Sequence, residues 1–271
     1  MFTALSGVEP VNTAATEADT APDGHRPPAN EHGSTIIDLE KITFAYPGRQ
    51  PVLKDLNLHF HGGQQIGLVA PNGSGKTTLF HLIMGLLKPA SGRVTIFGKS
   101  RCNEKDFLEV RRRIGLLFQD PDDQLFSPTV IEDVAFGPLN LGQSRAQARA
   151  TAEETLASLG LGGFAERITH QLSGGEKRLV SLATVLAMAP EILLLDEPTN
   201  GLDTDTRGRI VDILKGLKIS FILISHNLDF LSQLTDTIYT MTAGRILTDQ
   251  PLAPHQHTHV HAHGTVPHEH R

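Results

Sequence analysis

The sequence contains one cysteine, Cys102, in 271 residues. A single cysteine cannot form a disulfide within the chain, which fits a protein of a reducing compartment. Basic residues are also few, because Lys and Arg number 24 against 30 Asp and Glu, and the formal net charge is −6. The basic side chains are spread along the chain, so the composition argues against a protein that coats nucleic acid.

Long apolar runs are missing as well. The longest candidate, residues 179–189, is ended by Pro190 and Glu191, well short of the ~20 residues that a membrane helix needs. Residues 1–20 hold Glu9, Glu17 and Asp19 but no Lys or Arg, unlike the basic start of a signal peptide. We therefore expect a cytoplasmic chain, or one that reaches a membrane only through partner proteins.

What is present suggests one sizeable core with a satellite subdomain, because the chain is longer than a usual single domain. Residues 1–34 are rich in Pro, Ala, Thr and acidic side chains, and we expect them to form a disordered leader. We expect the folded domain to span residues 35–250, and a flexible histidine-rich tail to follow over 251–271. Helical patterns over residues 129–136 and 143–159 predict a helical subdomain at about 120–175, inserted into the sheet domain.

Two kinds of strand pattern are visible. Leu56, Leu58 and Phe60 alternate with polar residues, which is typical of a half-buried antiparallel strand, and Val94 with Ile96 suggests a second strand of that sheet. Continuous apolar runs without alternation occupy residues 66–69, 114–118, 192–195 and 221–224. Such runs predict parallel strands that are covered on both faces by helices.

Polar groups follow each of the continuous runs. They are a glycine-rich loop, Gln119, the pair Asp196-Glu197 and the pair Ser225-His226. Ligands of parallel sheets bind beyond the C-terminal ends of the strands, so these groups are expected to meet at one edge. Their chemistry suits a nucleotide, Mg²⁺ and an attacking water.

The glycine-rich loop has the pattern of a phosphate-binding loop. Its expected nucleotide-binding residues are Asn72, Gly73, Ser74, Gly75, Lys76, Thr77 and Thr78. We expect Lys76 to reach the β- and γ-phosphates and the Thr77 hydroxyl to coordinate Mg²⁺. A structural glycine turn would leave unexplained both the preceding buried strand and the Lys-Thr pair.

The loop opens a helix whose apolar side is expected to hold Leu79, Leu82, Ile83 and Leu86. The usual pattern of the loop begins with Gly, where this chain has Ala70. A methyl group there costs about 1–2 kcal/mol if the position requires a positive φ, and is harmless if φ is negative.

The pair Asp196-Glu197 is the second chemical element. Asp196, at the strand end, is expected to hold Mg²⁺ through a water, and Glu197 to polarise the water that attacks the γ-phosphate. The alternative, two solvated carboxylates at the start of a loop, is reasonable for one acid alone and weakens beside a phosphate loop. A second glycine-rich helix start, Ser173-Gly174-Gly175, offers another site for a phosphate.

The order of these motifs, with Gly201-Leu202-Asp203 and His226, resembles the ATPase subunit of ATP-binding-cassette (ABC) transporters. The resemblance covers roughly residues 36–248. It implies an α/β fold: a P-loop nucleoside triphosphatase core with a mostly parallel sheet, a small antiparallel β subdomain and the inserted helical subdomain. It also implies ATP with Mg²⁺ and a head-to-tail dimer with a second copy of the chain.

The resemblance assigns further roles by position. Tyr46 would stack on adenine, and Gln119 would touch Mg²⁺ and sense the membrane partner. Ser173, Gly174 and Gly175 would bind the γ-phosphate of the opposite subunit, and Asp203 would cross the interface. His226 would hold the γ-phosphate near Glu197, so Lys76, Gln119, Glu197 and His226 form the expected catalytic set. Tyr46 could instead be a strand aromatic, and His226 a lone loop histidine.

A finer resemblance runs over residues 117–142, with Leu-Phe-Gln-Asp-Pro-Asp-Asp-Gln and Glu-Asp-Val-Ala-Phe-Gly-Pro. It is similar to the energy-coupling-factor branch, and within it to cobalt and nickel importers. The branch implies a transmembrane coupling subunit and a metal-binding membrane subunit as partners, at the cytoplasmic face of the membrane. We hypothesise that Asp120, Asp122 and Asp123 line the groove that receives a basic helix of the coupling subunit.

The last segment is rich in histidine. Imidazole suits Co²⁺ and Ni²⁺, and we expect that metal binding involves His255, His257, His259, His261 and His263. A purification tag or a solubilising tail is the alternative, and the interrupted spacing argues against an ordinary tag.

Taken together, these patterns predict that the chain is the ATPase of a metal importer. Its rivals are an importer of the same branch for a vitamin or other solute, a soluble non-transport ABC ATPase, and a metal-binding protein with an inactive cassette.

Overall fold

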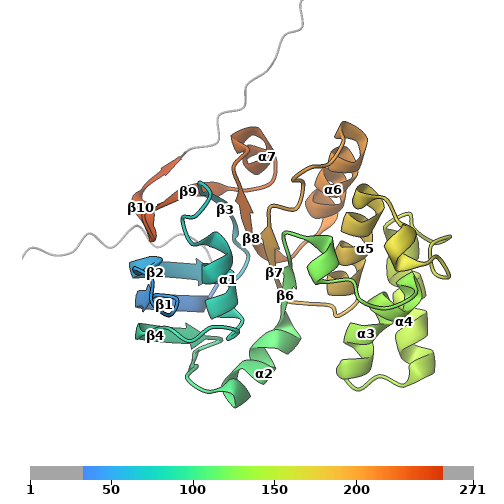
Figure 1. The fold of residues 1–271 in the computed structure, drawn as a ribbon, viewed down its shortest axis with the longest axis horizontal. Helices are drawn as coiled ribbons and strands as arrows, with labels where there is room; N and C mark the ends of the chain where they lie inside the picture. Colours follow the sequence, from blue (N-terminus) through green and yellow to red (C-terminus); the bar gives the residue numbers. More distant parts are fainter. Residues whose placement is uncertain (1–32, 253–271) are drawn as a thin grey trace, which may run out of the picture. The chain divides into compact units, whose positions relative to one another are not determined.

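The structure is a computed structural model, and it describes residues 33–252. Figure 1 labels its elements in chain order. The strands are β1 (Thr35–Phe44), β2 (Leu53–His61), β3 (Gln65–Val69), β4 (Ser91–Ile96), β5 (Lys99–Ser100), β6 (Ile114–Leu117), β7 (Ile192–Asp196), β8 (Ser220–Ser225), β9 (Thr237–Thr242) and β10 (Arg245–Leu252). The α-helices are α1 (Lys76–Ile83), α2 (Glu104–Arg113), α3 (Val130–Asn140), α4 (Arg145–Ser158), α5 (Gly174–Leu186), α6 (Thr204–Gly216) and α7 (Leu228–Ser232), and two 3-10 turns are η1 (Pro121–Asp123) and η2 (Thr169–Gln171).

Most of the predicted leader (residues 1–34) and of the predicted tail (residues 251–271) lies outside the described range. The tail histidines from His255 to His263 are therefore not among the described residues.

A small antiparallel sheet has the strand order β2-β1-β4-β5. Along β2, Leu56, Leu58 and Phe60 are buried and the residues between them are exposed, as the alternation predicts. Leu79 and Phe80 of α1 belong to the same apolar cluster. This sheet therefore packs against the helix that follows the phosphate loop.

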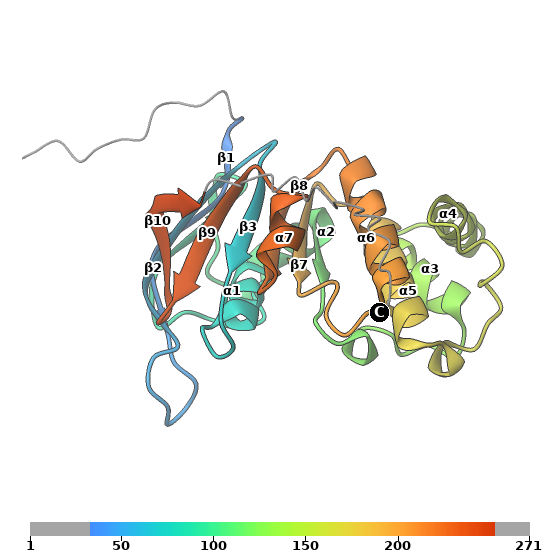
Figure 2. The same ribbon diagram turned by 90° about the horizontal axis from the view of Figure 1, so that it is seen from above.

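The larger sheet has the order β10-β9-β3-β8-β7-β6, and all its strands except β10 run parallel. Figure 2 shows these strands side by side from β10 to β7. Leu193 and Leu195 of β7 pack in one apolar cluster with α5 and α6, whereas Ile192 and Leu194 pack in another with α1 and α2. Both faces are covered, which explains why the run carries no alternation.

Three helices, α3, α4 and α5, pack on one another and form a group beside the larger sheet (Figure 1). Each begins at a capping box, in which a hydroxyl residue and an acid or amide three residues later satisfy the first free N–H groups. The helix predicted over residues 129–136 continues through Pro138 to Asn140, and the one predicted over 143–159 spans Arg145–Ser158. None of the helices in the described range has the length and apolarity needed to cross a membrane.

The prediction for Leu86 was wrong. α1 ends at Ile83 because Gly85 takes a positive φ of 68°, and the Leu86 N–H then bonds back to the His81 carbonyl at 2.8 Å. Leu86 therefore lies beyond the helix and is 50% exposed.

Candidate nucleotide site

Polar side chains meet at one edge of the larger sheet. The parallel strands β3, β6, β7 and β8 end there and lead into the phosphate loop, Gln119, Asp196-Glu197 and Ser225-His226. Side-chain hydrogen bonds join three of these four groups directly. This convergence agrees with the sequence prediction.

The phosphate loop curves through two glycines in the left-handed region, Gly73 at φ 78° and Gly75 at φ 101°. The φ of Gly75 is one that residues with side chains rarely adopt, and an added Cβ would also lie 2.7 Å from Leu53 Cδ2, so the position favours glycine. Gly75 gives α1 no side-chain cap, which leaves the N–H groups at the start of α1 free for a phosphate. Ala70 is buried and does not take a positive φ, so its methyl group causes no backbone strain.

Thr77 and Asp196 are joined across the loop. The Thr77 hydroxyl donates to Asp196 Oδ2 at 2.8 Å, and Asp196 is only 2% exposed. Its second oxygen, Oδ1, is buried and has no hydrogen-bond partner among the described residues. Burial raises the pKa of Asp196, and the Thr77 bond and the positive charge of Lys76 oppose that rise.

Glu197 is the most heavily constrained residue of the site. It is 2% exposed and has a φ of 47°, which is unusual for a residue with a side chain. Lys76 Nζ donates to Oε1 at 3.0 Å, the Ser225 hydroxyl donates to Oε2 at 3.3 Å, and His226 Nδ1 lies 3.1 Å from both oxygens. The carboxylate is therefore held by three residues from two segments, α1 and the end of β8, with the His226 ring on its exposed side.

Gln119 shares a cavity of about 580 Å³ with Thr77 and Asp196. Gly174, Asn200 and Gly201 line other parts of this cavity. Gln119 itself is exposed and lies two residues after the end of β6. The cavity therefore joins the group expected to contact Mg²⁺ to the start of α5.

Tyr46 lies two residues after the end of β1 and packs, partly buried, against the apolar cluster of the small sheet. Its hydroxyl is 3.1 Å from the hydroxyl of Thr78 in the phosphate loop. The ring packs edge-on against Phe44 at 5.0 Å. The aromatic face expected for adenine therefore stands beside the phosphate loop.

The second glycine-rich segment is separate from the phosphate loop of the same chain. Ser173 and Gly174 are exposed at the start of α5, and no hydrogen bond within the described range joins residues 173–175 to the phosphate loop. The Ser173 N–H bonds to Glu176 and lowers the pKa of that carboxyl. Asp203 is also exposed, and it caps α6 by accepting from the Thr206 N–H at 2.9 Å, which lowers the pKa of Asp203.

A family model described as ABC transporter matches residues 53–200. The chain belongs to this family. It is an ABC transporter ATPase subunit, and its activity is ATP hydrolysis.

The names of similar proteins range from a general ABC transporter name to a named transport system. The chain is 52% identical over 239 residues to a Nitratidesulfovibrio vulgaris protein provisionally named as an ABC transporter ATP-binding protein, covering 88% of this chain and 87% of that one. It is 44% identical over 218 residues to the cobalt import ATP-binding protein CbiO of Rhodobacter capsulatus, covering 79% and 78%. It is 41% identical over 218 residues to the energy-coupling factor transporter ATP-binding protein EcfA of Methanothermobacter thermautotrophicus, covering 79% and 70%.

A solved structure supports the same assignment. The chain matches a dimeric ATP-binding cassette in a post-hydrolysis state with ADP and phosphate, at a TM-score of 0.73 and 28% identity, covering 81% of this chain and 99% of that one. The predicted α/β fold of an ABC ATPase is thus confirmed.

The structure of the ABC ATPase adds a residue that sequence reasoning missed. Arg178 of α5 is 2% exposed and donates from Nη1 to the Phe118 carbonyl at 2.6 Å and from Nη2 to the Gln119 carbonyl. In the sequence, Arg178 stands next to Lys177 in a helix start, where a basic residue usually faces solvent. No pattern signals that one of the two turns inward.

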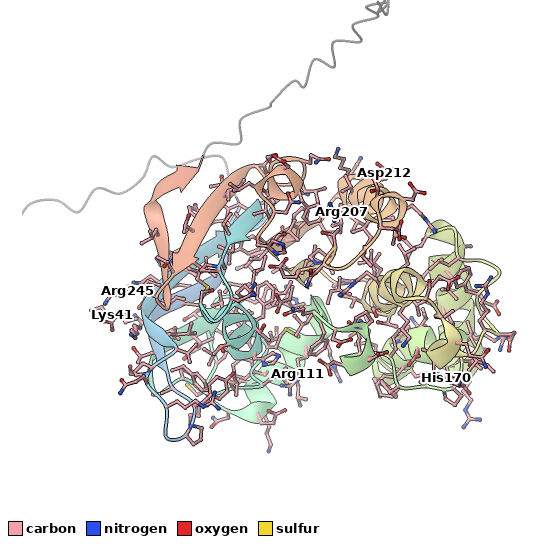
Figure 3. The ribbon with its side chains drawn as sticks, turned by 45° about the horizontal axis from the view of Figure 1, so that its top comes forward. Lys41, Arg111, His170, Arg207, Asp212 and Arg245 are labelled. Carbon is pink, nitrogen blue, oxygen red and sulfur yellow. The ribbon has the colours of Figure 1, made fainter. Side chains whose placement is uncertain are left out.

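The acidic residues after Gln119 differ in their surroundings. Asp120 and Asp123 line the cavity beside Thr77, and Asp122 pairs with Lys177 Nζ at 2.6 Å. A separate groove of about 280 Å³ is lined instead by mainly apolar residues, with exposed Phe126 and Phe136 on its wall. Arg111, labelled in Figure 3, is another residue of this groove. None of the three acids lines this apolar groove, and their predicted contact with a basic helix of the coupling subunit stays a prediction.

Proposed function

We propose that this ABC ATPase powers the import of a divalent transition metal, cobalt or nickel, through an energy-coupling-factor transporter. Residues 117–142 support the branch, together with the likeness to relatives named EcfA and CbiO. The geometry around Asp196 and Glu197 carries the ATPase part of the proposal. The metal part rests on the name of a relative and on the histidines of the last segment.

The residues at the strand ends fit Mg²⁺ and a triphosphate. A buried carboxylate oxygen without a partner, Asp196 Oδ1, stands beside the Thr77 hydroxyl, and the buried Ser74 hydroxyl is also unpartnered among the described residues. Oxygen ligands of this kind are those that Mg²⁺ prefers. Thr77, Gln119 and Asp196 would hold the ion, which supplies neutralisation of the phosphate charge when bound.

Lys76 changes partners when a nucleotide enters. In the structure it is buried and donates to Glu197 at 3.0 Å and to Asn72 Oδ1 at 3.4 Å. The β- and γ-phosphates carry more negative charge than one carboxylate, so Lys76 turns to them. Glu197 then loses its cation and becomes a free base.

Glu197 acts as the general base. His226 and Ser225 continue to hold its oxygens while it takes a proton from the attacking water. The His226 ring is exposed, so it can also donate to the γ-phosphate from the open side of the site. The left-handed backbone of Glu197 keeps the carboxylate at this position at a cost in strain.

The second half of each site would come from a second copy of the chain. Ser173 and Gly174 are exposed, and within the described range the hydrogen bonds of Ser173 are to residues of α5, a helix long enough to offer a dipole to the γ-phosphate. Asp203 is exposed at the start of α6 and would cross the interface. Tyr46 would stack on the adenine of its own nucleotide.

The apolar groove would receive the coupling subunit at the cytoplasmic face of the membrane. Phe126 and Phe136 are 66% and 47% exposed and form an edge-on pair at 4.9 Å. Exposed aromatic pairs of this kind are enriched at protein interfaces. The metal-binding membrane subunit would complete the transporter, and the tail histidines from His255 to His263 would bind Co²⁺ or Ni²⁺ on the cytoplasmic side.

The ATPase is tested by replacing Glu197 with Gln. We expect ATP turnover to fall at least about a hundredfold, because the general base is lost. Mg-ATP should then trap a stable dimer, visible by light scattering after size-exclusion chromatography. An exchange at an exposed residue of α4 outside the cavity, Glu153→Gln, is the control and should change neither result. A Glu197→Gln chain that stays monomeric in saturating Mg-ATP would refute the shared-site mechanism.

The solute is tested in vesicles that contain the chain with the membrane subunits that co-purify with it. We expect ATP-driven uptake of ⁵⁷Co²⁺ or ⁶³Ni²⁺, and none with the Glu197→Gln chain. Uptake of a vitamin without metal uptake would instead identify an importer of the same branch for another solute. A chain without residues 253–271 should hydrolyse ATP as before but bind less Co²⁺ at equilibrium.

A further inference from the structure

Arg178 is a buried cation that the proposed reaction does not use. Its guanidinium contacts two backbone carbonyls, Phe118 O at 2.6 Å and Gln119 O, and its Nε has no partner among the described residues. Burial lowers the pKa of Arg178, and the carboxylates of Asp120 and Asp196 oppose that shift. Burying a charge costs free energy, so the placement of this guanidinium against the backbone of residues 118–119 calls for an explanation.

The segment after β6 is tied to α5 at further points. Gln124 Nε2 donates to the Ser181 carbonyl and to the Thr184 hydroxyl, each at 2.7 Å, and Gln124 Oε1 accepts from the Phe118 N–H at 3.2 Å. On the preceding turn of α5, Lys177 pairs with Asp122 at 2.6 Å. Residues 118–124 are therefore fixed to α5 along two turns, while the side chain of Gln119 stays exposed in the cavity beside Thr77.

We propose that Arg178 is a positioning residue that couples the two ATP sites of the dimer. The inference rests on the proposed shared-site function. α5 begins with Ser173-Gly174-Gly175, which would face the partner's nucleotide, and one turn later Arg178 holds the backbone of Gln119, which faces the chain's own nucleotide. A shift of α5 toward the partner's phosphate therefore carries Gln119 with it.

The chemistry of the side chain suits this role. The forked guanidinium of an arginine can donate to two adjacent carbonyls at once and fixes their direction, which a single ammonium cannot do. The link is short and continuous, because Arg178 lies five positions after Ser173 and one hydrogen bond joins Arg178 to Gln119. Loss of the fork should reduce the coupling between the sites and leave the phosphate loop intact.

The test compares Arg178→Met, Arg178→Lys and the wild-type chain. Methionine has a similar length but no donor, and lysine restores the charge without the fork. ATP turnover is measured against ATP concentration and against Mg²⁺ concentration. We expect the Hill coefficient for ATP to fall from near two in the wild type toward one in both variants. Turnover should fall about tenfold or more, as for the loss of one charge-assisted hydrogen bond, and the half-saturating Mg²⁺ concentration should rise.

Controls separate coupling from folding. Arg149→Met removes an exposed arginine of α4 that pairs with Glu153 and Glu166, and it should leave all three values unchanged. Binding of a fluorescent ATP analogue without Mg²⁺ should be similar in every chain, because the phosphate loop is untouched. If Arg178→Met is unfolded, Gln124→Met loosens the same segment by other contacts and should give the same changes.

Folded Arg178 variants with a wild-type Hill coefficient and Mg²⁺ dependence would overturn the inference, as would lower turnover with both values unchanged. A wild-type chain that hydrolyses ATP without cooperativity would overturn it too. Trapping of the Glu197→Gln dimer by Mg-ATP tests the shared-site function separately. A trapped dimer with unchanged Arg178 kinetics would refute the coupling role alone.

Discussion

At the scale of single residues, the site contains interactions that lower the stability of the folded chain. Glu197 has a left-handed backbone, and Asp196 is buried with one oxygen unpartnered. The two carboxylates are neighbours in the chain. Burial is the largest cause of the raised pKa of Asp196, and the negative charge of Glu197 raises it further. The Thr77 hydrogen bond and the positive charge of Lys76 lower it. Such costs are typical of sites whose geometry serves a ligand rather than the stability of the free protein.

Asp196→Asn should stabilise the nucleotide-free chain. We expect the free energy of unfolding at pH 7 to rise by about 1–3 kcal/mol, because a buried, incompletely paired charge is removed. The raised pKa means that the folded chain binds a proton more tightly than the unfolded chain. The penalty in the wild type is therefore full at neutral pH and vanishes as pH falls toward the unfolded value of about 3.9.

Urea unfolding of both chains from pH 5 to pH 8 measures this difference. The advantage of Asn should shrink on the acid side. The variant should also lose the extra stability that Mg-ATP gives the wild type. An advantage that grows toward low pH would contradict the assignment of the penalty to Asp196.

Ala70→Gly tests the departure at the start of the phosphate loop. Ala70 has no positive φ and its methyl is buried in the core. Glycine should therefore lower the unfolding free energy by about 1 kcal/mol without tightening nucleotide binding. Calorimetric titration with ATP checks affinity, and a clear gain in affinity would show that the methyl group strains the loop.

At the scale of elements, close packing joins α5 to β6. A Cβ on Gly115 of β6 would lie 2.3 Å from Val185 Cγ1 of α5. The helix that carries the second glycine-rich segment therefore rests directly on the strand that leads to Gln119. This contact and the Arg178 fork hold the same two elements together.

Gly115→Ala should force α5 away from β6. We expect the unfolding free energy to fall by about 1–3 kcal/mol, which is usual for overpacking in a core. Gly208→Ala on the exposed face of α6 is the matched control, because nothing lies within 4 Å of its added methyl. It should be neutral or slightly stabilising. Equal stability of both variants in urea would contradict the close packing.

The sequence predicted the elements that follow simple periodicities. Continuous apolar runs predicted β7 and β8, because strands buried on both faces need no polar residues. Alternation of apolar and polar residues predicted β2, because only one face of that strand is buried. The ends of helices were less predictable, since Gly85 ended α1 before Leu86. The inward turn of Arg178 could not be predicted, because its carbonyl partners lie about 60 residues away and carbonyls are the same in every residue.

At the scale of the whole described molecule, two concave sites share Leu116 and Phe118 in their walls. The cavity of Thr77 and Asp196 mixes charged and polar groups with apolar residues such as Phe80, whereas the groove of Phe126 and Phe136 is mainly apolar. Residues 118–124 contribute to both, with Asp120 on one side and Gln124 on the other. A nucleotide-driven shift of this segment would therefore reach the groove directly.

Replacing Phe126 and Phe136 together with Ser should detach the chain from its membrane partner. The two rings would offer about 2–4 kcal/mol of apolar burial to a docked helix, so their loss should weaken docking at least tenfold. The measurement is the fraction of tagged chain in the membrane pellet of cells that produce the whole transporter. ATP turnover of the purified chain should stay within about twofold, because neither ring lines the nucleotide cavity.

Leu108→Ser is the matched control. It removes another exposed apolar side chain, on α2 and outside the groove, and should leave the membrane fraction unchanged. A double variant that sediments with membranes like the wild type would place the docking surface elsewhere on the ATPase.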